Sequence, residues 1–185
     1  MIILASASPR RKELLSKIAN DFKIVPSDID EESLITDTLS VLEIPEFLST
    51  KKAMDIKNKY PTDTIIAADT AIVLDNKIYG KPKTKEEAKD MLKKFSNRTH
   101  YVITGVCIAS PVRTMSFSSI NEVTFYNLSE TEIDEYLLNN EYIDKAGSYA
   151  IQGKASLFIK KINGDYNSII GLPISEINRI LKNFF

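Results

Sequence analysis

The chain has 185 residues, of which 43% are hydrophobic, and is long enough to bury a core without a disulfide or a structural metal. Its 24 basic and 25 acidic side chains leave a net charge of −1, which gives no reason to expect binding to nucleic acid or to a membrane. The single cysteine, Cys107, excludes an internal disulfide and is typical of a reducing compartment. We therefore expect a cytoplasmic protein with a single domain over residues 1–185.

Apolar patterns and turn residues predict strands that alternate with helices along the chain. In chain order we expect a strand at 2–5, a helix at 9–18, a strand at 22–25, a helix at 45–59, a strand at 64–74 with a return through 78–79, a helix at 84–95, strands at 99–109 and 114–126, a helix at 129–139, strands at 157–162 and 166–170, and a helix from 173. The alternation predicts an α/β fold, whereas hairpin signals at 76–77 and 163–165 argue against a wholly parallel sheet. We expect a mixed, twisted β-sheet flanked by helices.

The segment Leu4–Leu15 combines a short strand, a serine-rich turn and the start of a helix. Ser8 suits an N-cap, and Pro9 suits the first helical position. Arg10 and Arg11 then lie at the positive end of the helix dipole, where a cation is disfavoured by about 0.3–1 kcal/mol. Free amides, a dipole and two guanidinium groups together would bind a phosphate. Two solvated arginines are the alternative, and this segment alone does not decide between them.

A single carboxylate interrupts the most apolar stretch of the chain, Ile65–Leu74. Both faces of this expected strand are apolar, which is typical of a strand covered on both sides. Asp69 shares a face with Ala67 and Ala71, whose small side chains leave space beside it. Because an unpaired carboxylate is costly there, a metal ligand or general base is the favoured interpretation. Pairing with a nearby lysine is the alternative.

Three further charged features are candidates for binding. Lys81 lies between a glycine and a proline, on a stiff backbone that suits contact with a phosphate; a solvated loop lysine is the alternative. In the helix 45–59, Lys52 precedes Ala53 near the apolar side, so we expect this lysine to point inward. The acidic loop 28–32 either supplies oxygen ligands to Mg²⁺ or is a solvated loop.

Several well-known sites are missing from the sequence. There is no P-loop, dinucleotide fingerprint or nucleophile elbow. His100, the only histidine, is interpreted as structural, and Cys107 as a core residue. Without paired histidines or cysteines, a zinc site is not expected. The remaining arginine, lysine and carboxylate groups point to chemistry on phosphate esters or anhydrides with a divalent metal.

Four motifs, in this order, give the chain a resemblance to the Maf family of nucleoside triphosphate pyrophosphatases. They are Ser6–Arg11, Ala68–Thr70, Gly80–Pro82 and Asp144–Gly153. The resemblance runs from Leu4 to about Ile174. It implies an elongated mixed sheet with helices that form two lobes around a deep cleft, similar in fold to inosine triphosphatase, and often a homodimer. The two phenylalanines at 184–185 could pack within the chain or against such a partner.

The resemblance implies hydrolysis between the α and β phosphates, giving a nucleoside monophosphate and pyrophosphate, with Mg²⁺ or Mn²⁺. Asp69 matches the family's proton acceptor, and whether it acts as base, metal ligand or both stays open. Glu31 matches an acidic position near the metal; because the loop reads Asp-Ile-Asp-Glu where many members have glutamates, Asp30 is the alternative. The positions that match the family's phosphate-binding residues are Arg11, Lys52 and Lys81.

Three other positions match those that the family associates with substrate choice, namely Arg10, Thr70 and Gln152. The amide of Gln152 can both donate and accept, which suits the edge of a uracil or thymine ring. The combination looks like the branch that hydrolyses dTTP and UTP. Modified pyrimidine nucleotides, as substrates of a house-cleaning enzyme, are an alternative. A nucleotide-binding regulator of cell division and septum formation, with little turnover, is the alternative function.

Overall fold

The computed structural model describes residues 1–36 and 38–183, so the C-terminal phenylalanine pair lies outside the described residues. The chain forms two compact units, which are taken separately below. Unit 1 comprises Met1–Thr70, Ile103–Ser119 and Asp165–Phe185, and unit 2 comprises Ala71–Val102 and Ile120–Gly164. A single domain over the whole chain stays a prediction.

The strands form one seven-stranded sheet in the order β2-β1-β3-β5-β6-β7, with β4 also paired to β3. The strands are β1 (Ile2–Leu4), β2 (Phe22–Ile24), β3 (Thr64–Leu74), β4 (Lys77–Tyr79), β5 (Thr99–Ala109), β6 (Thr114–Phe125) and β7 (Ile159–Asn163). The helices are α1 (Pro9–Ser16), α2 (Glu31–Leu34), α3 (Ile44–Lys59), α4 (Lys85–Phe95), α5 (Glu130–Leu137), α6 (Tyr166–Ile170) and α7 (Ile174–Lys182), with 3-10 turns η1 (Ala146–Ser148) and η2 (Lys154–Phe158). Parallel pairs at β1 and antiparallel pairs at β4 and β7 confirm the predicted mixed α/β fold. None of the described helices is long and apolar enough to span a membrane.

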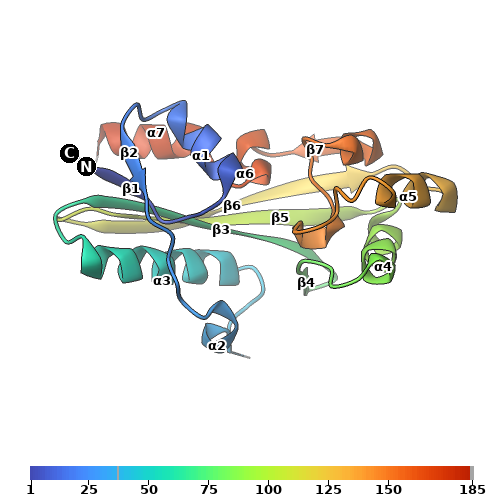
Figure 1. Cartoon of the computed structure of the whole chain (residues 1–185), viewed down its shortest axis with the longest axis horizontal. Helices are drawn as coiled ribbons and strands as arrows, with labels where there is room; N and C mark the ends of the chain where they lie inside the picture. Colours follow the sequence, from blue (N-terminus) through green and yellow to red (C-terminus); the bar gives the residue numbers. More distant parts are fainter. Residues whose placement is uncertain (37, 184–185) are drawn as a thin grey trace. The chain divides into compact units, whose positions relative to one another are not determined.

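In unit 1, β1 lies between β2 and β3 and runs parallel to both. The chain leaves β1 through α1 to reach β2, then passes through α3 to reach β3 on the other side of β1. Figure 1 shows α3 on one face of the sheet and α1 and α7 on the other. The carboxyl end of β1 is therefore a topological switch point, where ligands of open α/β sheets bind.

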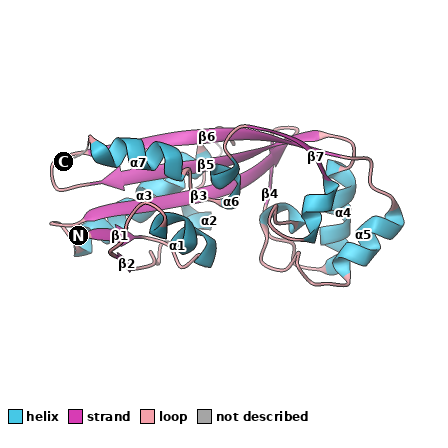
Figure 2. Cartoon of the chain, turned by 90° about the horizontal axis from the view of Figure 1, so that it is seen from above, coloured by secondary structure: helices cyan, strands magenta, loops and turns pink. Residues whose placement is uncertain are grey.

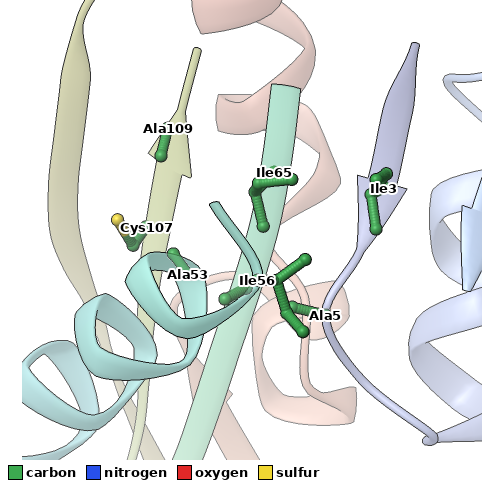
Figure 3. Close-up of a cluster of buried hydrophobic side chains, with 8 residues drawn as sticks. Ile3, Ala5, Ala53, Ile56, Ile65, Cys107 and Ala109 are labelled. Carbon is green, nitrogen blue, oxygen red and sulfur yellow. The ribbon is translucent and has the colours of Figure 1, made fainter. Parts of the chain in front are cut away.

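The core of unit 1 packs α3 against the sheet. Ala53 and Ile56, three residues apart on α3, meet Ile65 of β3 and Cys107 of β5 (Figure 3). Burial raises the pKa of the Cys107 thiol to about 11, as expected for a core residue. Gly105 permits this close approach, because a Cβ there would lie 2.1 Å from the backbone nitrogen of a residue in the first turn of α3.

In unit 2, β3 and β4 form a hairpin whose turn lies one residue earlier than predicted. Asp75 and Asn76 both have positive φ, 51° and 57°, as a two-residue type I′ turn requires. Helices α4 and α5 lie side by side (Figure 2). His100 is buried among aromatic rings, including that of Phe95 in α4, and its Nε2 lies 2.6 Å from the hydroxyl oxygen of Tyr149. The histidine is structural, as interpreted from the sequence.

The predicted strand 166–170 is wrong, because these residues form helix α6. The side chain of Asp165 accepts hydrogen bonds from the amides of Asn167, at 2.8 Å, and Ser168, at 3.4 Å. Asp165 therefore caps a helix instead of closing a hairpin. Strand β7, which precedes this cap, pairs with β6.

Candidate active site

The first turn of α1 is built as the sequence predicts. Ser8 is the N-cap and accepts from the amide of Arg11 at 3.4 Å, and Pro9 occupies the first turn. Arg10 and Arg11 therefore both lie at the positive end of the helix. Burial lowers the pKa of the Arg11 guanidinium; the nearby carboxylate of Asp69 raises it, and Arg10 lowers it further. The helix start concentrates positive charge, which an anion would stabilise.

The guanidinium of Arg11 is fixed by three hydrogen bonds within unit 1. Its Nε donates to the carbonyl oxygen of Gly171 at 2.9 Å, and Nη1 donates to the hydroxyl of Ser6 at 3.3 Å. Nη2 donates to the hydroxyl of Thr70 at 3.1 Å. Of the five N–H donors of an arginine, two are left for a bound anion. Arg11 is therefore held in place instead of being the solvated arginine of the alternative interpretation.

Lys52 bridges two carboxylates in unit 1. Its Nζ lies 2.7 Å from Oδ1 of Asp69 and 2.9 Å from Oε1 of Glu31. The Lys52 side chain is only 11% exposed, which confirms that it points inward from α3. Asp69 is thus paired with a lysine, the alternative interpretation of its place in an apolar strand. The guanidinium of Arg11 also interacts electrostatically with Asp69 and Glu31, so two carboxylates and two cations gather at this site.

The acidic loop ends in the short helix α2, which separates the two candidate acids. Asp30 is the N-cap of this helix, and its side chain accepts from the amide of Ser33 at 3.4 Å. Glu31 is the neighbour that contacts Lys52. Glu31, and not Asp30, therefore contacts Lys52, the lysine that is paired with Asp69.

The fit of this cluster to a divalent metal follows from its donor set. Within residues 1–36 and 38–183, no group of three or more His, Cys, Asp or Glu side chains could hold a metal ion. Asp69 and Glu31 nevertheless lie within 3 Å of the same ammonium nitrogen. Mg²⁺ is usually bound by one or two carboxylates, together with water and substrate phosphates, instead of a cage made by protein alone. Two carboxylates at a candidate phosphate site fit that description.

The switch point explains why these side chains gather. The last residue of β1, Leu4, pairs with Ile66 of β3. Beyond this pair β3 continues to Asp69 and Thr70, while the chain after β1 turns away through Ser6 into α1. Side chains from the loop, from α1 and from β3 therefore meet just past the carboxyl end of a parallel strand.

The predicted site residues of unit 2 lie on two segments that are hydrogen-bonded to each other. The amide of Gly147 donates to the carbonyl oxygen of Gly80 at 3.0 Å. The Nζ of Lys81 lies 3.5 Å from a carboxylate oxygen of Asp144, and both side chains are exposed. Gln152 is exposed as well. Its role and that of Lys81 stay predictions.

Sequence reasoning missed Thr104 and Ser168, which are linked to Thr70 by hydrogen bonds. The hydroxyl oxygens of Thr70 and Thr104 are 2.9 Å apart, and Thr104 donates to the carbonyl oxygen of Ser168 at 2.8 Å. Thr104 is fully buried in β5. The available signal was a hydroxyl within the otherwise apolar residues 102–109 of β5, the same kind of interruption that singled out Asp69 in β3.

The fold and this cluster define a mixed α/β protein with a charged site at a switch point. Among solved structures, a Ham1 protein from Staphylococcus aureus matches with a TM-score of 0.53 and 17% identity, covering 100% of this chain and 99% of that one. A HAM1 protein from Coxiella burnetii matches with a TM-score of 0.55 and 14% identity, covering 98% of each chain. Both likenesses concern the fold.

The chain belongs to the Maf family, whose model, described as Maf-like protein, matches residues 1–184. Proteins named dTTP/UTP pyrophosphatase are similar to it over nearly their whole length. That of Bacillus pumilus is 47% identical, with 99% of this chain and 96% of the relative covered. That of Pyrococcus abyssi is 47% identical, with 98% and 95% covered, and that of Latilactobacillus sakei is 43% identical, with 99% and 100% covered.

Proposed function

We propose that the chain is a nucleoside triphosphate pyrophosphatase that hydrolyses dTTP and UTP to the monophosphate and pyrophosphate. The observation that carries the proposal is the contact of Lys52 with both Asp69 and Glu31. The residue after Asp69 in β3, Thr70, accepts a hydrogen bond from Arg11. In this proposal the cations at this end of β1 bind phosphate, and the carboxylates serve the water and the metal. The full-length relatives named dTTP/UTP pyrophosphatase support the choice of substrate.

Phosphate binding falls to the cations of the site. Arg11 offers its two remaining N–H groups, in an orientation that Ser6, Thr70 and Gly171 fix before the anion arrives. Lys52, and by the resemblance Lys81, neutralise charge that develops as pyrophosphate leaves. Catalysis of this kind depends mainly on positioning and electrostatic stabilisation, which phosphoryl transfer requires.

Asp69 serves the attacking water. Because Lys52 contacts Oδ1, we assign Oδ2 to accept the hydrogen bond, and then the proton, of that water. The water oxygen forms a bond to the α-phosphorus, the bond from that phosphorus to the bridging oxygen breaks, and pyrophosphate leaves with the electron pair. Asp69 then releases the proton to solvent. The low intrinsic pKa of a carboxyl group makes orientation of the water its larger contribution.

Asp69 and Glu31 are the residues that would hold a divalent ion. Bound there, Mg²⁺ or Mn²⁺ supplies charge neutralisation on the triphosphate and lowers the pKa of a coordinated water. The chain's own part is to hold both carboxylates close together. Lys52 does this through its two ion pairs, and its ammonium group would also serve a substrate phosphate.

A panel of nucleotides tests the proposal. The protein is incubated with Mg²⁺ and dTTP, UTP, CTP, ATP, GTP or pyrimidine triphosphates modified at the base, and products are separated by chromatography. We expect monophosphate and pyrophosphate in equal amounts, with the highest kcat/KM for dTTP and UTP or for a modified pyrimidine. Release of diphosphate and inorganic phosphate, or binding of nucleotide without turnover, would contradict it.

A further inference from the structure

We propose that Thr104 is a positioning residue for Arg11, acting through a closed ring of hydrogen bonds that joins β5, β3, α1 and the end of α6. The inference rests on the proposed function, because Arg11 is its phosphate-binding group. Thr104 belongs to none of the motifs that point to the site. It carries no charge and reaches no substrate, so its effect must pass through other residues.

The ring has five members, all in unit 1: Arg11, Thr70, Thr104, Ser168 and Gly171. Nη2 of Arg11 lies 3.1 Å from the Thr70 hydroxyl, which lies 2.9 Å from that of Thr104. Thr104 lies 2.8 Å from the carbonyl oxygen of Ser168. That carbonyl also accepts from the amide of Gly171 at 2.9 Å, and the carbonyl of Gly171 accepts from Nε of Arg11 at 2.9 Å.

The donors in this ring can be assigned without ambiguity. A carbonyl oxygen only accepts, so Thr104 gives its one hydroxyl proton to Ser168. Thr104 must then accept from Thr70, because the two oxygens are in hydrogen-bond contact and Thr104 has no second proton. The proton of Thr70 is thereby used, and its lone pair accepts from Arg11, which only donates. Each donor on the threonine side of the ring is therefore nearer to the guanidinium than its acceptor, and the last acceptor is the carbonyl of Ser168 in α6.

Two consequences follow for the site. Thr70 has no proton left to donate to a nucleotide, so we assign its effect on substrate choice to the orientation of Arg11. The ring of hydrogen bonds also holds the guanidinium at two atoms. Nη2 donates to Thr70, and Nε donates to the carbonyl of Gly171. Removing the buried hydroxyl of Thr104 frees the Thr70 proton to rotate and loosens one of these two attachments.

The ring also accounts for the conformation of Gly171. This residue ends α6 with φ of +131°, a region that side chains other than glycine rarely adopt. That turn directs the Gly171 amide back to Ser168 and its carbonyl forward to Arg11. A Cβ added there would lie 3.5 Å from Nε of Arg11 and 3.7 Å from the Thr70 hydroxyl. The backbone at the end of α6 therefore supplies an acceptor that orients the Arg11 side chain.

The test compares Thr104→Val, which removes the hydroxyl at nearly constant volume, with Thr104→Ser, which keeps it. Thr99→Val is the matched control, because Thr99 lies in the same strand and its hydroxyl contacts Thr124 on an exposed part of the sheet. Each change is also made in an Arg11→Ala background. The readouts are kcat/KM for dTTP, the Kd for inorganic pyrophosphate with Mg²⁺, and the thermal midpoint.

We expect Thr104→Val to lower kcat/KM by roughly tenfold to a hundredfold, as misplacement of a binding group does, and to weaken pyrophosphate binding. Thr104→Ser and Thr99→Val should stay near the parent. In the Arg11→Ala background the valine change should cost less than about twofold, because the path then has nothing to position.

Parental activity of Thr104→Val, or an equal loss with and without Arg11, would overturn the inference while leaving the proposed function intact. If the parent protein does not hydrolyse dTTP, the proposed function fails, and pyrophosphate binding decides the inference separately. Weaker pyrophosphate binding by Thr104→Val, seen only when Arg11 is present, would then support it. No pyrophosphate binding by the parent would overturn both.

Discussion

Asp69 and Thr70 are consecutive residues of β3 whose side chains engage opposite sides of the sheet. Asp69 contacts Lys52 of α3, and Thr70 contacts Arg11 of α1. Alternation along a strand dictates this arrangement, and α3 and α1 lie on the two faces that it addresses. Two consecutive residues therefore serve different parts of the proposed chemistry. Asp69 is assigned to the water and the metal, and Thr70 orients Arg11, which binds phosphate.

Replacing Asp69 by Asn should lower kcat for dTTP by roughly 10²–10⁴-fold, because the amide NH2 in place of Oδ2 can accept neither the hydrogen bond that orients the attacking water nor its proton. The fold should persist, since the amide oxygen can still accept from Lys52. Steady-state release of pyrophosphate measures the effect, and circular dichroism checks the fold. Asp134→Asn is the control, because Asp134 also binds a lysine but lies on α5 in unit 2. Equal rates for Asp69→Asn and the parent would remove Asp69 from the mechanism.

The pair Glu31→Gln and Asp30→Asn tests which acid serves the metal. We expect Glu31→Gln to raise the Mg²⁺ concentration needed for half-maximal rate by at least about tenfold. Asp30→Asn should leave that concentration near the parental value, since asparagine is also a good N-cap for α2. Titration of Mg²⁺ at saturating dTTP measures both. The reverse order of effects would assign the metal to Asp30.

Removing the charge of Lys52 should destabilise the free protein. Lys52→Met leaves Asp69 and Glu31 close together without their shared cation, so we expect a loss of about 1–3 kcal/mol in the free energy of unfolding. Urea denaturation without metal measures it. Lys51→Met, the exposed neighbour, should change stability little. Adding Asp69→Asn to Lys52→Met should recover part of the loss; an undiminished loss would show that packing of the lysine stem, and not its charge, is responsible.

Gln152→Glu should impair the use of pyrimidine nucleotides without changing the metal requirement. A carboxylate has no N–H to offer a carbonyl of uracil or thymine, and losing one such bond costs about tenfold in kcat/KM. The ratio of kcat/KM for UTP to that for a purine triphosphate is the informative quantity. It should fall, and the Mg²⁺ dependence should stay the same. A uniform loss over all nucleotides would argue against a role in specificity.

Burial of His100 should make stability depend on pH. Burial lowers its pKa from the usual 6.5 to about 3, so the folded protein keeps the ring neutral while the unfolded chain takes up a proton below pH 6.5. Because the unfolded state binds more protons in this range, stability falls as pH falls, by up to about 1.4 kcal/mol per unit. Urea denaturation at pH 7.5 and 5.5 measures the slope. His100→Phe should reduce it, and an unchanged slope in that variant would exclude His100 as its source.

Local chemistry allowed much of this fold to be read from the sequence. The N-cap at Ser8 is formed by residues within one helical turn, so its geometry does not depend on distant segments. The apolar pattern likewise predicted the bounds of β5 without error. The same pattern along α3 predicted that Lys52 points inward.

Where a residue suits two local structures, only tertiary contacts decided. Asn-Gly-Asp at 163–165 is compatible with a hairpin and with a helix cap, and pairing of β7 with β6 left Asp165 to cap α6. Asp30 and Glu31, at the start of α2, were both open as the acid near the metal, and only the fold brought Lys52 to Glu31.

The sequence by itself determined most of the local elements, the position of the charged groups along the chain and the family resemblance. The support of Arg11 was decided by the tertiary structure alone. Its partners Thr70 and Gly171 lie 59 and 160 positions away along the chain, and Thr104 reaches a carbonyl 64 positions away. Hydrogen bonds to backbone carbonyls depend on position in space and hardly on residue type, so no pattern of letters could indicate them.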